Sequence, residues 1–155
     1  MIDLKTPLHP TIDRLIAKLE KHPEVFDPAV NPYAVRVVIT GSRPDPSAFG
    51  EFPHFISFDG FIDVEYTPEQ LERVALISEP FCRYAKWKGG PEPLPAQEKQ
   101  VIEQLIAKSH KAGKPIRFWC SPDNAVAWET FRKLGIDIIN TDQPEACTLY
   151  FQQNP

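Results

Sequence analysis

Short hydrophobic runs alternate along this chain with segments that have the spacing of helices. Five of the runs end in polar side chains and predict strands, at residues 1–5, 35–40, 55–58, 115–119 and 136–140. Between them, apolar residues recur at helical spacing over residues 11–21 and 96–112, and Gly113 marks the end of the second helix. The repeated order of strand, helix and strand predicts right-handed βα units and a parallel sheet.

One further helix has a clear start signal. Thr67 has the position of an N-cap, Pro68 follows at the first helical position, and Gln70 completes a capping box. The segment that follows, residues 74–78, fits either the end of this helix or a short strand. The pattern leaves these two alternatives open.

Length and charge narrow the class of protein. A chain of 155 residues with 42% hydrophobic residues suits a single domain with a core of its own, at residues 1–155. The net charge of −4 gives no general attraction to nucleic acid, so we expect no nucleic-acid partner.

No apolar stretch approaches the roughly 20 residues that cross a bilayer, so we expect no transmembrane segment. Residues 1–20 lack the apolar block of a signal peptide, and the compartment stays open.

The three cysteines, Cys82, Cys120 and Cys147, are far apart in the chain and odd in number. This spacing matches neither a zinc site nor a disulfide framework. We therefore expect all three to be structural thiols.

Several chemically capable residues stand at the ends of predicted strands, where α/β enzymes place their active sites. Asp3 and Lys5 share a strand face, so they either bind a divalent cation and a phosphate oxygen or form only an ion pair. Arg43 follows a strand and a Gly-Ser turn, which suits phosphate or carboxylate recognition, although exposed loop arginines are common. Asp59 precedes Gly60 and either ligates a cation or forms an Asx turn.

The second half of the chain offers fewer candidates. Arg117 and Trp119 share one face of their strand, and Trp119 at a rim can line a substrate pocket, although tryptophans more often belong to the core. Asp123 is interpreted as the N-cap of a helix over residues 125–133, which Gly135 ends. None of the four histidines stands at the carboxyl end of a predicted strand, where a general acid or base would be expected.

Nearly the whole chain resembles a known superfamily. The segments that carry the resemblance are Ile2-Asp-Leu-Lys-Thr6, Val38-Ile-Thr-Gly-Ser-Arg-Pro44, Ser57-Phe-Asp-Gly60, Pro115-Ile-Arg-Phe-Trp-Cys-Ser-Pro-Asp-Asn-Ala-Val-Ala-Trp128 and Leu134-Gly-Ile-Asp-Ile-Ile-Asn-Thr-Asp142. They are similar to the phosphatidylinositol-specific phospholipase C-like phosphodiesterases, which include the glycerophosphodiester phosphodiesterases. The branch that the chain resembles most contains the "altered inheritance of mitochondria" proteins.

The resemblance implies a (β/α)8 TIM barrel, with residues 2–5 as strand four and residues 136–140 as strand eight. It implies that Asp3 is a ligand of a divalent cation, calcium or magnesium, and that Lys5 is a catalytic residue that approaches the phosphate. Arg43, Asp59 and Trp119 would line the substrate side of the rim. The catalytic histidines and a further acidic pair of metal ligands belong in this family to strands one and two, which the chain lacks.

The leading hypothesis is therefore the C-terminal part of a metal-dependent phosphoric diester hydrolase, acting on glycerophosphodiester or phosphoinositide-type substrates and inactive alone. A partial barrel of strands four to eight would have open edges, which predicts self-association through them. Relatives of this kind can be exported through an N-terminal signal that this chain lacks. A non-catalytic α/β domain that binds a phosphorylated ligand or a protein is the alternative, and a complete small α/β enzyme with unrelated chemistry is the third.

Overall fold

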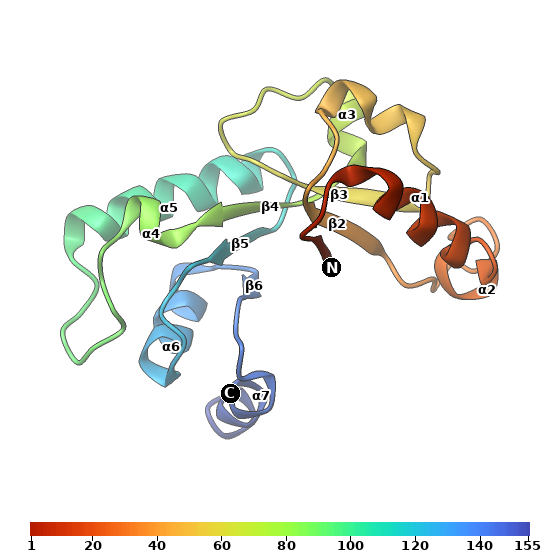
Figure 1. Cartoon of the computed structure of the whole chain (residues 1–155). Coiled ribbons are helices and arrows are strands. Elements are labelled where there is room, and N and C mark those ends of the chain that lie inside the picture. Colours follow the sequence, from red (N-terminus) through yellow and green to blue (C-terminus); the bar gives the residue numbers. More distant parts are fainter. The chain divides into compact units, whose positions relative to one another are not determined.

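The computed structural model describes all 155 residues and divides them into two compact units, Met1–Ala75 and Leu76–Pro155. Both units have α/β architecture, with parallel strands and with helices between them (Figure 1). The predicted α/β class with parallel strands is confirmed. The number of strands is six and not five, because the segment that the sequence left open is a strand.

The first unit contains three neighbouring parallel strands and the helices that connect them. Its elements are β1 (Ile2–Leu4), α1 (Leu8–Leu19), α2 (Pro23–Phe26), β2 (Val37–Gly41), the 3-10 helix η1 (Pro46–Glu51), β3 (Ile56–Gly60) and α3 (Pro68–Arg73). β2 pairs with β1 on one side and with β3 on the other. The carboxyl ends of all three strands therefore lie at one edge of this part of the sheet.

One face of these strands is apolar and packs against the connecting helices. Ile39 and Phe58 are fully buried, and the ring of Phe58 stacks on Phe49 of η1 with centroids 4.2 Å apart. Ile12 of α1 is also fully buried. Because successive side chains of a strand alternate between faces, the residues between these apolar positions point the other way.

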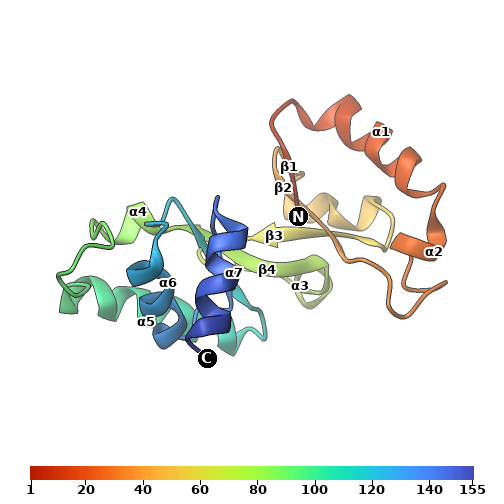
Figure 2. The same cartoon turned by 90° about the horizontal axis from the view of Figure 1, so that it is seen from below.

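The second unit repeats the pattern. Strand β4 (Val74–Pro80) begins at the end of the first unit, and the elements that follow are α4 (Phe81–Tyr84), α5 (Ala96–Lys111), β5 (Ile116–Trp119), α6 (Ala125–Leu134), β6 (Ile138–Ile139) and α7 (Pro144–Gln153). β5 pairs in parallel with both β4 and β6. α5 packs against β5, and α6 packs against β6 and against α7, which lies beside it in Figure 2.

The core of the second unit is largely aromatic. Phe81 lies edge-on to Phe131 at 5.3 Å between ring centroids and to Phe118 at 6.2 Å, and Trp87 reaches Phe131 at 6.3 Å. All four side chains are buried. Edge-to-face contacts of this kind contribute about 0.5–1.5 kcal/mol each beyond area burial, so the cluster stabilises the second unit.

The helix start and stop signals are largely confirmed. The Thr67 side chain accepts a hydrogen bond from the Gln70 amide, and the Gln70 side chain accepts one from the Thr67 amide, which is a complete capping box. Gly135 ends α6 in the left-handed conformation, at φ 82°. The sequence did not predict α7, whose first helical position is Pro144.

The expected role of Asp123 as an N-cap is wrong. The N-cap of α6 is Asn124, whose side chain accepts a hydrogen bond from the amide of Ala127 at 3.0 Å. Asp123 instead accepts bonds from the indole of Trp128 and the amide of Asp142, both at 2.8 Å. Burial raises the pKa of Asp123, but hydrogen bonds outweigh burial, that from the Thr141 side chain first and then those from Asp142 and Trp128, so its pKa lies below the usual range. The carboxylate holds the segment after β6 against the start of α6.

The expectation of three structural thiols is wrong for two of the cysteines. Cys82 and Cys120 form a disulfide, with Cα atoms 5.7 Å apart. They are 38 residues apart in sequence, but one follows β4 and the other follows β5, and these strands are neighbours. Only Cys147 is a free thiol, and burial raises its pKa.

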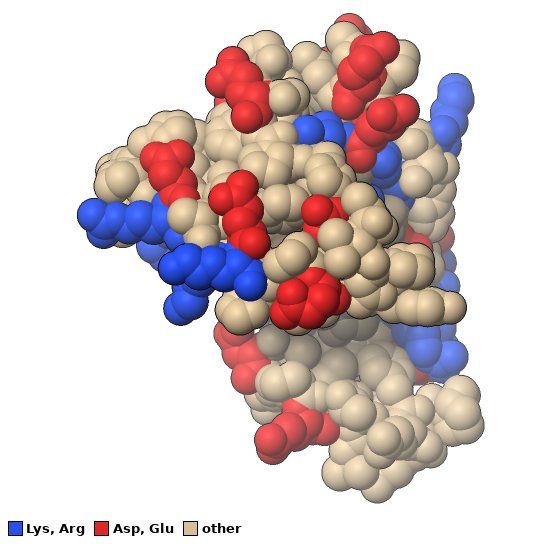
Figure 3. Space-filling model, turned by 90° about the vertical axis from the view of Figure 1, so that its right-hand side faces the viewer, with Lys and Arg blue, Asp and Glu red and all other residues tan.

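Two further features concern the charge of the surface and the lengths of the helices. Acidic and basic side chains are interspersed on the face drawn in Figure 3. The longest helix, α5, has 16 residues, and the protein has no helix with the length and apolar character needed to cross a bilayer.

The disulfide closes a long loop, which predicts a large effect on stability. Replacing both cysteines (Cys82→Ser with Cys120→Ser) is expected to lower the free energy of unfolding by about 4 kcal/mol, from the chain-entropy relation for a loop of this length. Urea unfolding of both proteins measures the difference. Cys147→Ser is the control for loss of a thiol without loss of a bridge. A double variant as stable as the parent protein would show that the bridge does not form in solution.

A second stability prediction concerns Asp137, which precedes β6. Its carboxylate accepts bonds from the Ile116 amide and from His110 Nε2, both at 2.8 Å. Burial raises the pKa of Asp137, and the two bonds outweigh this effect, so its pKa in the folded protein is below the usual range. A lowered carboxyl pKa stabilises the fold above the unfolded pKa of about 3.9, and this contribution disappears as the pH falls through the folded pKa.

Asp137→Asn is therefore expected to cost about 1 kcal/mol of unfolding free energy near neutral pH, a value reduced for the partial exposure of the pair. The cost should shrink as the pH falls below about 4, where the native carboxyl also becomes protonated. Denaturant unfolding across pH measures it. Asp142→Asn, at an exposed carboxylate of the same unit, is the matched control and should change the unfolding free energy by less than about 0.5 kcal/mol. A cost that stays constant with pH would contradict the assignment.

Candidate functional site

Each unit has one cluster of polar side chains on its strands, and in the first unit the cluster lies at their carboxyl ends. In the first unit we call them the Asp59 cluster, which consists of Asp3, Lys5, Thr40, Arg43 and Asp59. In the second unit we call them the Arg117 cluster, which consists of Ser78, Arg117 and Asn140. Each cluster is described within its own unit.

Parallel pairing builds the Asp59 cluster. Asp3 of β1 is the register partner of Thr40 of β2, and Phe58 of β3 is the partner of Ile39, so Asp59 comes level with Thr40. Side chains at paired positions point to the same face of a sheet. The hydroxyl of Thr40 accordingly donates to Asp59 Oδ2 at 2.7 Å. The three residues form a polar row across three strands.

Arg43 is held in place by Asp59. Its Nη1 donates to Asp59 Oδ1 at 2.7 Å, and its guanidinium lies 4.0 Å from the centroid of the Phe61 ring. The side chain of Asp59 is 3% exposed and that of Arg43 is 14% exposed. Both carboxylate oxygens of Asp59 therefore accept hydrogen bonds, from Thr40 and from Arg43, which are the partners that a buried carboxylate needs.

Asp3 and Lys5 form a far more exposed pair. Lys5 Nζ lies 2.5 Å from Asp3 Oδ2, with side chains 81% and 43% exposed. Gly41 stands next to them with φ 77°, and a Cβ atom there would collide with the Asp3 carboxylate and the Leu4 carbonyl. The turn after β2 therefore needs glycine, since any other residue would push Asp3 away. The ion pair is present, and binding of a divalent cation and a phosphate oxygen by these two residues stays a prediction.

The residues present do not fit a complete divalent-cation centre. Calcium takes 6–8 oxygen ligands, and magnesium takes octahedral geometry. The protein nowhere brings together three or more side chains of histidine, cysteine, aspartate or glutamate that could hold a metal ion. In the Asp59 cluster, the carboxylate of Asp59 is occupied by Thr40 and Arg43, which leaves Asp3 as the exposed carboxylate.

The Arg117 cluster has a cation at its centre. Arg117 of β5 donates from Nη1 to the hydroxyl of Ser78 on β4 at 2.9 Å, and from Nη2 to the side-chain oxygen of Asn140, which follows β6. Ser78 is 1% exposed. Strand pairing again explains the contact, because Ser78 and Arg117 are register partners. The cluster links β4 and β5 to the residue Asn140, which follows β6.

The predicted site residues divide between the units. Asp3, Lys5, Arg43 and Asp59 all belong to the Asp59 cluster. Trp119 belongs to the second unit, at the end of β5, where it is 42% exposed and pairs in register with Pro80. The core alternative for Trp119 is therefore wrong, and its contact with a substrate stays a prediction.

Sequence reasoning missed Thr40 and Ser78. Thr40 is a single polar residue at the end of an apolar run, and only the register with β3 brings it to Asp59. Ser78 lies in the segment that was open between helix and strand. Its neighbour Glu79 points to the opposite face, is 1% exposed, and accepts a hydrogen bond from the Tyr84 hydroxyl at 2.8 Å.

Of the four histidines, His9 lies soon after a strand. His9 lies at the start of α1, soon after β1, and its Nδ1 is 2.8 Å from Asp13 Oδ2. Both side chains are more than half exposed. His54, just before β3, pairs with Asp27, and His110 of α5 pairs with Asp137, just before β6, so neither belongs to a polar cluster described above.

Comparison of the chain with models of protein families, with curated proteins and with solved structures found no match. The superfamily resemblance therefore stays a prediction, and the geometry of the clusters carries the functional argument.

The buried ion pair of Arg43 and Asp59 can be tested by its effect on the free energy of unfolding. Arg43→Met leaves Asp59 as a buried carboxylate without its cation, and is expected to lower the free energy of unfolding by about 3 kcal/mol. Arg36→Met, at an exposed arginine just before β2, should change it by less than about 0.5 kcal/mol. Urea unfolding measures both. Adding Asp59→Asn to Arg43→Met should recover part of the loss, and equal costs for the two arginine variants would contradict the pairing.

Proposed function

We propose that this chain is the C-terminal part of a phospholipase C-like phosphodiesterase barrel, and that its Asp59 cluster binds the phosphate of a phosphodiester. The observation that supports the proposal most is the polar row across β1, β2 and β3, flanked by the cations of Lys5 and Arg43. A row at the carboxyl ends of parallel strands is where barrel enzymes bind substrate. With six strands, the chain would correspond to strands three to eight, one more than the sequence predicted.

The chemistry of the cluster suits a phosphodiester. A guanidinium has five N–H donors, and Asp59 accepts from Nη1, so Arg43 has further donors for two phosphate oxygens. The ammonium of Lys5 is exposed and adds a second positive charge. Asp59 fixes the direction of Arg43 before a ligand arrives, which lowers the entropy lost on binding. In this proposal Lys5 approaches the phosphate, and Arg43 orients it.

Hydrolysis needs more than this cluster contains. Proton transfer to the leaving group requires an acid and a base within hydrogen-bond reach of the phosphate. No histidine belongs to the Asp59 cluster, and Asp3 alone offers an exposed carboxylate for a cation such as calcium or magnesium. We therefore propose that residues 1–155 bind a phosphodiester of the glycerophosphodiester type without turning it over.

A second candidate is a non-catalytic domain that binds a phosphorylated ligand through the same cluster. It is favoured by the pair of Arg43 and Asp59, because an arginine held by a buried carboxylate binds anions without a metal. The two candidates differ in the metal: a barrel fragment is expected to bind its ligand more tightly with calcium or magnesium through Asp3, whereas a non-catalytic domain is not.

Calorimetric titration with glycerophosphocholine tests the proposal. Lys5→Gln should weaken binding about tenfold, because an exposed cation next to the phosphate is lost. Lys21→Gln, at an exposed lysine at the end of α1, is the matched control and should change it less than about twofold. Arg43→Lys keeps the charge and loses the planar fork, so it should also weaken binding.

The same protein samples are then assayed for hydrolysis of glycerophosphocholine. Release of choline is followed with calcium or magnesium present, and none is expected. Binding that neither Lys5→Gln nor Arg43→Lys weakens would exclude the Asp59 cluster as the phosphate site. Robust hydrolysis that Asp3→Ala abolishes would contradict binding without turnover and show that this chain holds a working metal site.

A further inference from the structure

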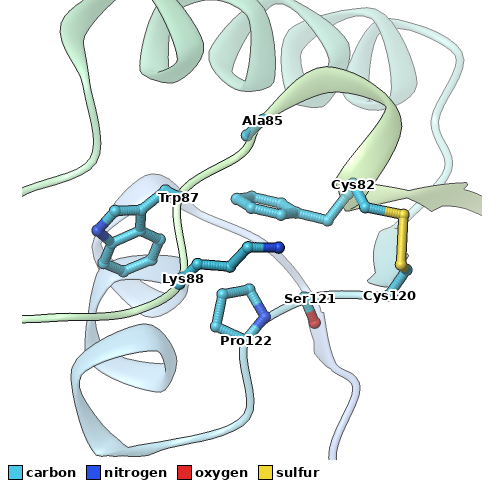
Figure 4. Close-up of a pocket in the computed structure, with 8 residues that line it drawn as sticks. Cys82, Ala85, Trp87, Lys88, Cys120, Ser121 and Pro122 are labelled. Carbon is cyan, nitrogen blue, oxygen red and sulfur yellow. A yellow bond between two sulfur atoms is a disulfide. The ribbon is translucent and has the colours of Figure 1, made fainter.

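The second unit contains a pocket that the proposed function does not use. Its volume is about 170 Å³, and it lies where β4 and β5 end, between the start of α4 and the connection from β5 to α6. Figure 4 shows the residues around it, with the Cys82–Cys120 disulfide on one side and Trp87 on the other. The residues that line it are Phe81, Cys82, Ala85, Trp87, Lys88, Cys120, Ser121 and Pro122.

The walls of this pocket are rigid. Phe81 and Trp87 belong to the buried aromatic core of the unit, and the Trp87 indole nitrogen donates to the Glu92 carbonyl at 2.8 Å. The disulfide ties Cys82 to Cys120 across the opposite side. A site whose walls are fixed before binding loses little entropy when a ligand enters.

Lys88 is the one group in the lining that carries charge. Disulfide-bonded cysteines do not titrate, and the other lining side chains are apolar or, in Ser121, a hydroxyl. Lys88 is exposed and has no hydrogen bond or ion pair within the protein. In Figure 4 its side chain extends between Trp87 and Pro122, with the amine end toward the side of the disulfide. The pocket thus combines flat apolar walls with one positive charge that lacks a counter-charge.

We propose that this pocket binds a small organic anion with a planar apolar body. The anionic group would pair with the ammonium of Lys88, and the flat part would lie against Phe81, Trp87 and Pro122. The size supports a small ligand, because drug-sized molecules occupy pockets of about 300–1,000 Å³. Burial of one ring contributes through apolar area, and the ammonium selects for negative charge.

Benzoate is the probe, because it has one ring and one carboxylate. Titration of the ¹⁵N-labelled chain should shift the indole signal of Trp87 and the amide signals of residues 81–88 and 120–122. Lys88→Gln should weaken benzoate binding about tenfold. Lys86→Gln removes the same charge from an exposed lysine two residues away that does not line the pocket, and it should change binding less than about twofold. Benzyl alcohol, which has the ring without the charge, should bind about tenfold more weakly than benzoate to the parent chain.

Three results would overturn the proposal. One is the absence of shifts in the pocket signals when benzoate is added. Another is a Lys88→Gln protein that binds benzoate as tightly as the parent chain. The third is an equal loss in Lys86→Gln, which would show a general effect of charge and no site. Lys88 is exposed, so folding of the variant is expected to be unaffected, and its amide spectrum without ligand checks this.

Discussion

Parallel pairing of neighbouring strands is the constraint on which both polar clusters depend. It sets Asp3 level with Thr40 and Thr40 level with Asp59 in the first unit, and Ser78 level with Arg117 in the second. Because all strands of a parallel sheet end at the same edge, polar residues that are distant in sequence come within hydrogen-bond distance. In the first unit the opposite face is apolar and packs against helices, so alternate residues of the same strands belong to the core and to the polar cluster.

Carboxylates in this protein mostly organise structure. Asp59 directs Arg43, Asp123 holds the segment after β6 against α6, and Asp137 ties α5 to the start of β5. Each accepts two or more hydrogen bonds, which compensates for the cost of leaving water. The consequence for function is that the cations Arg43 and Lys5 are the groups best placed to meet a ligand. In the second unit, Lys88 is likewise a cation that can contact a ligand, although no carboxylate holds it in place.

Much of the architecture was readable from local pattern. Apolar runs located five strands, the capping box at Thr67 marked α3, and Gly135 marked the end of α6, since caps and periodicity depend on residues near in sequence. One point that the sequence left open and one error were also local in origin. The segment at β4 carries both helical and strand features, and Asp123 beside Asn124 offered two adjacent N-caps, of which packing against Trp128 selected the second.

The sequence by itself determined the α/β class, the parallel strands and the placement of Asp3, Lys5, Arg43 and Asp59 near strand ends, because these follow from periodicity and turn residues. Only the tertiary structure decided which of them meet. The bond from Thr40 to Asp59, the link from Arg117 to Ser78 and the disulfide of Cys82 with Cys120 join residues between 19 and 39 positions apart. Such contacts depend on strand order and register, which arise when the strands pack together, and linear spacing does not encode them.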